Sequence, residues 1–110
     1  MNDQTDQVLL IPRYTSMAGD VYTAPINVRS YSEAQISVWR SGGLDGIGAS
    51  DVIVQESPDL EHWSDNGSTI GTVAGETTDS RGFRLDWMRL KVSGDPLTYW
   101  AVGNFVRRQG

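Results

Sequence analysis

The residues from Val54 to Gly67, VQESPDLEHWSDNG, combine the side-chain types that could do chemistry in this sequence. They include four carboxylates, the chain's only histidine, His62, and a tryptophan, Trp63. Histidines and carboxylates act as general acids and bases, and carboxylates also bind Ca²⁺. A polar connection between two strands would have the same composition. Each kind of chemistry therefore needs its own test.

A metal site is not supported by the spacing. A calcium-binding loop places oxygen ligands at alternating positions and a glycine at the sixth. Counted from Asp59, the third alternating position is Trp63 and the sixth position is Ser64. We therefore expect no metal site, and we expect no other cofactor.

Catalytic patterns are also missing. Glycoside hydrolysis needs two carboxyl groups across a cleft, but the 14 acidic residues of this short chain give such pairs by chance. His62 is the only imidazole that could serve as a base, and no G-x-S-x-G motif supplies an activated serine. The absence of cysteine excludes a thiolate nucleophile and a disulfide framework. We expect this protein not to be an enzyme.

The same segment fits a structural connection between strands. Pro58 fixes a backbone φ angle, and Asp59 can accept hydrogen bonds from nearby amides. Trp63 is expected to return toward the core and close the end of the hairpin, and Asn66 and Gly67 form the next turn. We interpret these five residues as structural.

The remaining sequence predicts strands, because apolar and polar residues alternate with a period of two. In the last half of the chain, Met88, Leu90 and Val92 share one face, while Arg89 and Lys91 share the other. The fold class that we predict is all-β, a single antiparallel β-sandwich of about eight short strands with jelly-roll-like connections. The expected strands are 8–11, 28–39, 51–57, 85–93 and 98–107, and turn signals occupy 17–20, 41–48, 65–67, 80–82 and 93–96.

Length and charge limit the other possibilities. The 110 residues suffice for one domain, 1–110, in which residues 1–7 form a polar N-terminal arm. The net charge of −5 at pH 7 argues against a nucleic-acid partner. No signal peptide and no transmembrane segment is recognisable, so we expect no membrane partner and a location in the cytoplasm or in a virion.

Two expected strands, the first and the last, are apolar on both sides, although the outer face of a sandwich should be polar. Either loops of the same chain cover these faces or another subunit does. The second alternative predicts protein partners, in a homo-oligomer or on a larger particle. The residues expected at that interface are Leu9, Ile11, Tyr14, Phe105, Arg107 and Arg108.

Two motifs carry a resemblance to a known family. Glu56-Ser-Pro-Asp59 is followed by Trp63, and Trp87-Met-Arg-Leu-Lys-Val92 forms an arginine-containing strand. They resemble the S-x-D-G-x-x-W hairpin and the R-x-x-R-L-x-V-type strand of discoidin-like (F5/8 type C-like) β-sandwich domains. Similar modules occur in phage and prophage particle proteins. The resemblance covers 52–92 and departs at Leu60, where that hairpin usually has glycine.

Two functions follow as hypotheses. The first is a non-enzymatic subunit of a larger assembly, such as a decoration or cement protein on a phage capsid. The second, implied by the resemblance, is a module that binds a glycan through exposed aromatic rings. The candidate rings are Trp39, Trp63, Trp87 and Trp100.

Overall fold

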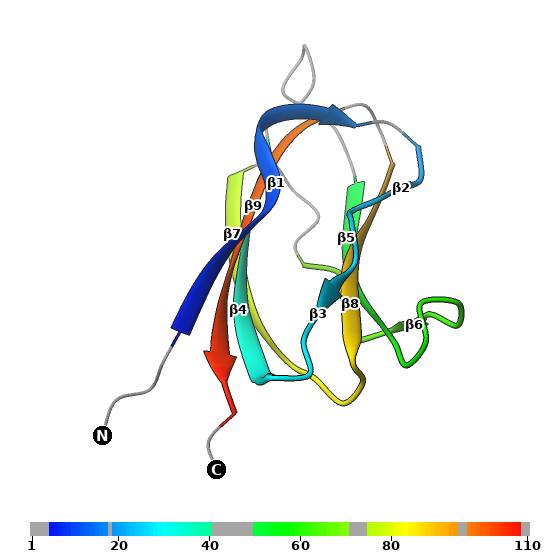
Figure 1. Cartoon of the computed structure of the whole chain (residues 1–110). Helices are drawn as coiled ribbons and strands as arrows, with labels where there is room; N and C mark the ends of the chain where they lie inside the picture. The colour runs from blue at the N-terminus through cyan, green and yellow to red at the C-terminus, as the bar shows by residue number, and fades with distance from the viewer. Residues whose placement is uncertain (1–4, 18, 41–49, 71–74, 95–96, 109–110) are drawn as a thin grey trace.

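The computed structural model describes residues 5–17, 19–40, 50–70, 75–94 and 97–108. Within these ranges the chain forms nine strands and no helix (Figure 1). The strands are β1 Thr5–Met17, β2 Val21–Tyr22, β3 Ile26–Asn27, β4 Tyr31–Arg40, β5 Ser50–Ser57, β6 Ser64–Asp65, β7 Gly75–Gly82, β8 Trp87–Gly94 and β9 Leu97–Arg107. None of the described segments is a helix that could span a membrane.

The strands form two sheets that pack face to face, as the edge-on view in Figure 1 shows. One sheet has the order β1-β9-β4-β7, and the other has the order β2-β8-β5-β6, with β3 also paired to β8. Neighbouring strands are antiparallel throughout the described pairings. The predicted antiparallel β-sandwich is confirmed.

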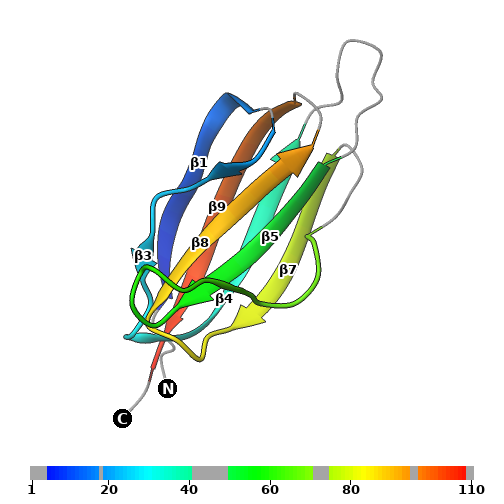
Figure 2. The same cartoon turned by 90° about the vertical axis from the view of Figure 1, so that its right-hand side faces the viewer.

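The strand order is that of a jelly roll. β2 and β3 both pair with β8, so together they act as one interrupted edge strand, and eight strand positions remain. The pairing is then nested: β1 with β9, β2–β3 with β8, β4 with β7, and β5 with β6. This is the pattern of a long antiparallel ribbon rolled into two layers (Figure 2).

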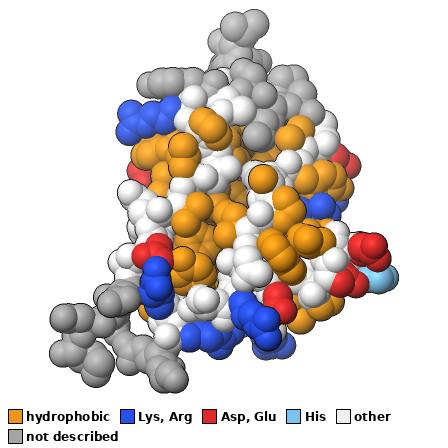
Figure 3. Space-filling view, viewed as in Figure 1, with side chains coloured by type: hydrophobic (Ala, Val, Ile, Leu, Met, Phe, Trp, Pro, Cys, Tyr) orange, Lys and Arg blue, Asp and Glu red, His pale blue; other side chains and the backbone are white. Residues whose placement is uncertain are grey.

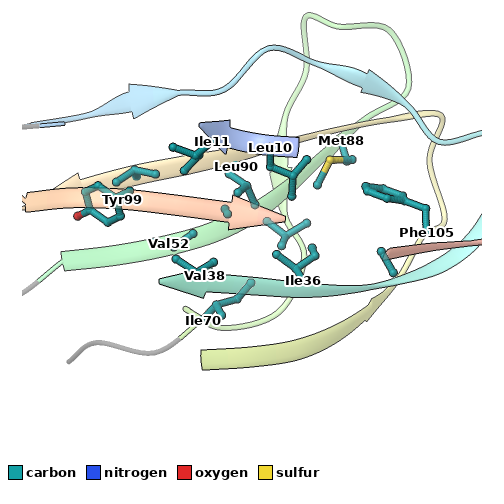
Figure 4. Packing of buried hydrophobic residues seen from close by; sticks show 14 of the residues in the cluster. Leu10, Ile11, Ile36, Val38, Val52, Ile70, Met88, Leu90, Tyr99 and Phe105 are labelled. Carbon is teal, nitrogen blue, oxygen red and sulfur yellow. The ribbon is translucent and has the colours of Figure 1, made fainter. Parts of the chain in front are cut away.

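The core lies between the two sheets, and alternation along β4, β5, β8 and β9 supplies most of it (Figure 4). Met88, Leu90 and Val92 of β8 are buried, as the sequence predicted, and β4 contributes Ile36 and Val38. Burying one such side chain stabilises a fold by roughly 1.5–3 kcal/mol. The core residues thus decide which face of these strands points inward.

Strand β1 is longer than the sequence indicated, and it is irregular. It begins at Thr5, so residues 5–7 are paired with β9 rather than forming an arm; residues 1–4 lie outside the described residues. A bulge between Leu9 and Ile11 lets both Leu10 and Ile11 point into the core. The strand also continues past Pro12 through a second register shift, which an edge strand tolerates.

Strand β7 was missed by the sequence analysis, which assigned Ser80, Arg81 and Gly82 to a turn. The structure corrects this, because these residues end β7 and pair with β4. The strand lies at the edge of its sheet, so the residues on its inward side, including Asp79 and Arg81, are polar and only partly buried. No apolar alternation therefore marked it.

Candidate interaction surface

The outward side of the four-stranded sheet combines apolar and polar side chains, and we call it the open face. Tyr99 and Ala101 of β9 are buried, so Trp100 and Val102 between and after them point outward. The strand registers give the other members. The open face consists of Thr5, Gln7, Leu9 and Arg13 of β1, Trp100, Val102, Asn104 and Val106 of β9, Glu33, Gln35, Ser37 and Trp39 of β4, and Glu76, Thr78 and Ser80 of β7.

An apolar patch occupies one half of the open face. Leu9 is 57% exposed and lies in register with Val102, which is half-buried. Leu9, Val102, Trp100 and Gln7 line a shallow pocket of about 330 Å³. Neighbouring apolar side chains that stay accessible on a sheet are typical of a contact surface for another molecule.

One row of the open face carries two charges and two indole rings. The guanidinium carbon of Arg13 lies 4.5 Å from the ring centroid of Trp100. Trp100 is in register with Trp39 on β4, and Trp39 is in register with Glu76 on β7. Across the four strands the row therefore reads cation, aromatic, aromatic, anion.

The next two rows of the open face carry no charge. The first of them contains Leu9, Val102, Ser37 and Thr78, in which the two hydroxyl oxygens lie 2.9 Å apart and share a hydrogen bond. The second row contains Gln7, Asn104, Gln35 and Ser80. Three carboxamides, each able to donate and accept, thus lie side by side on the sheet.

No protein-family model matches the sequence, and no curated protein matches it. The fold resembles that of a prophage-derived protein. The crystal structure of SPBc2 prophage-derived protein YomS aligns with a TM-score of 0.67 over 96% of each chain, at 10% sequence identity. At that identity, the similarity shows a shared fold.

The predicted interface residues do not all lie on one surface. Leu9 lies on the open face, whereas Ile11 and Phe105 are completely buried in the core. The assignment of Ile11 and Phe105 to an interface was therefore wrong, because a side chain with no exposed surface cannot contact a neighbour. Tyr14 belongs to β1, but its side chain is not among those that the structure describes.

The two predicted interface arginines are exposed, and both are engaged within the chain. Arg107 donates to Asp6, with its Nη2 2.8 Å and its Nε 3.0 Å from Oδ2. The hydroxyl of Tyr31 also donates to this oxygen, at 2.6 Å, and these bonds hold the pKa of Asp6 below its usual value. Arg108 donates to the carbonyls of Arg29 and Phe83. The arginines tie the end of β9 to its neighbours.

The outward side of the other sheet carries an aromatic stack. The guanidinium carbon of Arg89 lies 4.1 Å from the ring centroids of both Tyr22 and Trp63. Arg89 also donates from Nε to Gln55, and Gln55 donates to Asp65. Trp63 therefore packs on the outward side of β8, whereas Met88 and Leu90 of this strand are buried on its inward side. Trp63 does not pack against the core as predicted.

The loop after β5 explains the cluster of acids around His62. Oδ1 of Asp59 accepts hydrogen bonds from the backbone amides of Glu61 and His62, both at 2.9 Å, and Oδ2 lies 2.6 Å from Nδ1 of His62. Leu60 has a positive φ of 70°, and its carbonyl accepts a bond from the indole of Trp63. In Figure 3 the acidic and histidine side chains of this loop project from one side of the molecule.

These contacts give Asp59 a structural role. Among the described residues, Asp59, Glu61 and His62 form the group whose ligand atoms come close enough to hold a metal ion. The carboxylate of Asp59 is already used by the amides of the turn. The bonds from His62 and Glu61 hold the pKa of Asp59 well below its ordinary value, because they stabilise the charged form.

We expect Asp59→Ala to lower the melting temperature at neutral pH. The pKa of Asp59 is lowered in the folded state, so its contribution to stability is complete above the unfolded pKa, near 4, and is lost as the pH falls through the folded pKa. The gap in melting temperature between the natural chain and Asp59→Ala should therefore narrow below about pH 4. A thermal melt series at several pH values measures it. A gap that stays constant with pH would contradict this role, and Glu61→Ala is the matched control.

Asn66 and Gly67 of the predicted connection follow β6. Asn66 donates from its backbone amide to Val54 and from its side chain to the carbonyl of Gly82. Gly67 has a positive φ of 79°, and a Cβ at this position would lie 2.9 Å from Nε of Arg81. Pro58 is exposed. Arg81 holds this turn by donating to the carbonyls of Asn66 and Ser68.

A polar pocket of about 690 Å³ lies where β5, β6 and the segment before β8 meet. Glu56, which is only 6% exposed, forms part of its wall. Oε1 of Glu56 accepts the backbone amides of Arg84 and Leu85 at 2.8 and 3.1 Å. The carboxylate therefore fixes the connection into β8, and sequence reasoning did not identify this role.

Proposed function

We propose that this protein is a non-enzymatic structural subunit that binds a larger assembly, most specifically a capsid-associated phage protein of the decoration or cement type. The observation that carries the proposal is the open face, where an exposed leucine and two half-buried tryptophans lie together on one sheet. Aromatic residues and arginine are enriched in the centre of protein interfaces.

The phage context is supported by the fold. The fold is similar over nearly the whole chain to that of a protein described as prophage-derived. Jelly rolls with this nested strand pairing are also a common architecture of viral capsid proteins. The acidic net charge fits a protein that contacts other proteins rather than the packaged nucleic acid.

The absence of catalysis is part of the proposal. The only histidine has a side chain that is 79% exposed and pairs with Asp59 in a turn. The buried carboxylate of Glu56 is bonded to two backbone amides. Both groups thus have structural partners that account for their positions, which supports a binding role.

The proposal can be tested on particles from the strain that encodes the protein. We expect the natural chain to copurify with density-gradient-purified particles, and Leu9→Lys to be present at least tenfold less, because a charge on the apolar patch would be buried without a partner. Quantitative mass spectrometry of the particles gives the copy number. Leu60→Lys is the matched control, since Leu60 is 43% exposed but lies off the open face. Particles without the natural chain would refute the proposal.

A glycan-binding module is the second candidate, and one observation favours it. All four tryptophans are half-buried rather than buried, so each retains some accessible ring surface. Trp39 and Trp100 are neighbours on the open face, with carboxamides two rows away. The discoidin-like hairpin motif supports the same candidate. A glycan array in which the natural chain binds and Trp100→Ala does not would establish it.

A further inference from the structure

We propose that the open face is occupied by a second copy of this chain, packed face to face about a two-fold axis parallel to the strands. The inference rests on the proposed function: the open face joins two copies, and the resulting dimer is the unit that binds the larger assembly. In such a dimer the two open faces are stacked, and the rotation exchanges the two edges of the sheet. β1 of one copy then lies opposite β7 of the other, and β9 lies opposite β4.

The charged row is self-complementary under this rotation. Its order across the strands is Arg13, Trp100, Trp39 and Glu76. The two-fold rotation leaves the row at the same height along the strands and reverses the order of its residues across the sheet. Arg13 of each copy therefore lies opposite Glu76 of the other, and Trp100 lies opposite Trp39. The dimer would contain two Arg13–Glu76 ion pairs at its rim and two Trp100–Trp39 pairs between them. Each pair occurs twice because an isologous interface repeats every contact by symmetry.

The two uncharged rows are compatible with the same axis. Leu9 and Val102 of one copy would cover Thr78 and Ser37 of the other, whose hydroxyls are already bonded to each other. In the next row Asn104 would lie opposite Gln35, and carboxamides can bond to one another in both directions.

The last row, which contains Glu33 and Val106, is not complementary under this rotation. Here the axis would bring Glu33 opposite Val106, which buries a carboxylate against an apolar side chain. The contact is therefore centred on the first three rows.

The size of the open face also suits a small interface. Strands spaced ~4.8 Å apart with a rise of ~3.4 Å per residue give the first three rows a footprint of about 400 Å² per copy. The total of about 800 Å² is smaller than that of stable protein interfaces and falls in the range of weak, transient contacts. A weak, reversible dimer is therefore expected.

Charge exchange tests the pairing directly. Arg13→Glu and Glu76→Arg each place like charges opposite each other twice, so each should weaken dimerisation at least tenfold in sedimentation equilibrium. The double variant should return to within about threefold of the natural chain. An equimolar mixture of the two single variants should form a heterodimer, because both ion pairs are restored between the copies. The heterodimer excludes rescue within one chain.

Arg84→Glu is the charge-reversal control, because Arg84 is exposed and lies off the open face, and it should leave the dissociation constant unchanged. A natural chain that remains monomeric at several hundred micromolar would overturn the inference. So would single variants that dimerise normally, or a mixture without heterodimer.

The same variants distinguish failure of the inference from failure of the proposed function. A monomeric natural chain that is still found on purified particles, and is lost from them with Leu9→Lys, would refute self-association and leave the particle role intact. A charge-dependent dimer that is absent from particles would refute the particle role and establish the dimer.

Discussion

We expect Phe105→Ala to lower the free energy of unfolding by about 3–5 kcal/mol, the range for removing a large aromatic ring from a core. Phe105 is completely buried. Its ring lies 5.8 Å from that of Phe83 and 5.3 Å from that of Tyr31, measured between centroids. It also fills the space above Gly103, where a Cβ would come within 2.5 Å of the ring. Urea unfolding followed by tryptophan fluorescence measures the loss.

The neighbouring residue on β9 provides the control for this experiment. Val106 points to the opposite side of the sheet and is only half-buried, so Val106→Ala should cost about 1 kcal/mol or less. Equal losses for the two variants would contradict the assignment of Phe105 to the core. Because a domain of this size has a stability of roughly 5–15 kcal/mol, Phe105→Ala can unfold a large fraction of the molecules.

Glu56→Ala should destabilise the protein by about 2–4 kcal/mol, since it removes the acceptor for two backbone amides at a buried position. The amides belong to Arg84 and Leu85, which lead the chain into β8. Glu56→Gln keeps a side-chain oxygen at this position and should recover at least half of the loss. The measurement is the same urea titration at neutral pH.

Glu61→Ala is the appropriate comparison for Glu56→Ala, because it removes an exposed carboxylate from the nearby loop. It should change the free energy of unfolding by less than about 0.5 kcal/mol. If Glu56→Ala were equally mild, the buried amides would have found another acceptor, and the structural role assigned to Glu56 would be wrong.

Much of the fold could be predicted because period-two alternation is strong wherever a strand has one buried face. Strand β8 illustrates this, with Met88 and Leu90 inside and Arg89 outside. Strand β7 could not be predicted in the same way. It is an edge strand, and Arg81 on its inward side bonds to a loop instead of packing in the core.

The candidate surface was only partly predictable for a different physical reason. When both sides of a strand are apolar, as in β9, the sequence does not indicate which side meets the other sheet. Phe105 and Trp100 differ by an odd number of positions, so only one of them can be in the core, and the core partners decide which. The prediction chose Phe105 for the interface, whereas the structure buries it and leaves Trp100 on the open face.

In the hairpin after β5, side-chain hydrogen bonds stabilise a backbone conformation that usually requires glycine. Leu60 adopts a positive φ of 70°, at the position where the similar hairpin of discoidin-like domains usually has glycine. This conformation disfavours a side chain with a Cβ. The amide bonds to Asp59 and the indole bond from Trp63 to the carbonyl of Leu60 hold the turn in this shape.

The position of β9 has a consequence for synthesis on the ribosome. Among the described strands it is made last, yet it lies in the interior of its sheet, between β1 and β4. Among the described strands, β1 pairs with β9 alone. The nascent chain therefore cannot complete this layer until Arg107 has left the exit tunnel. Premature termination before β9 would release a polypeptide whose first strand has no partner, a substrate for chaperones and proteases.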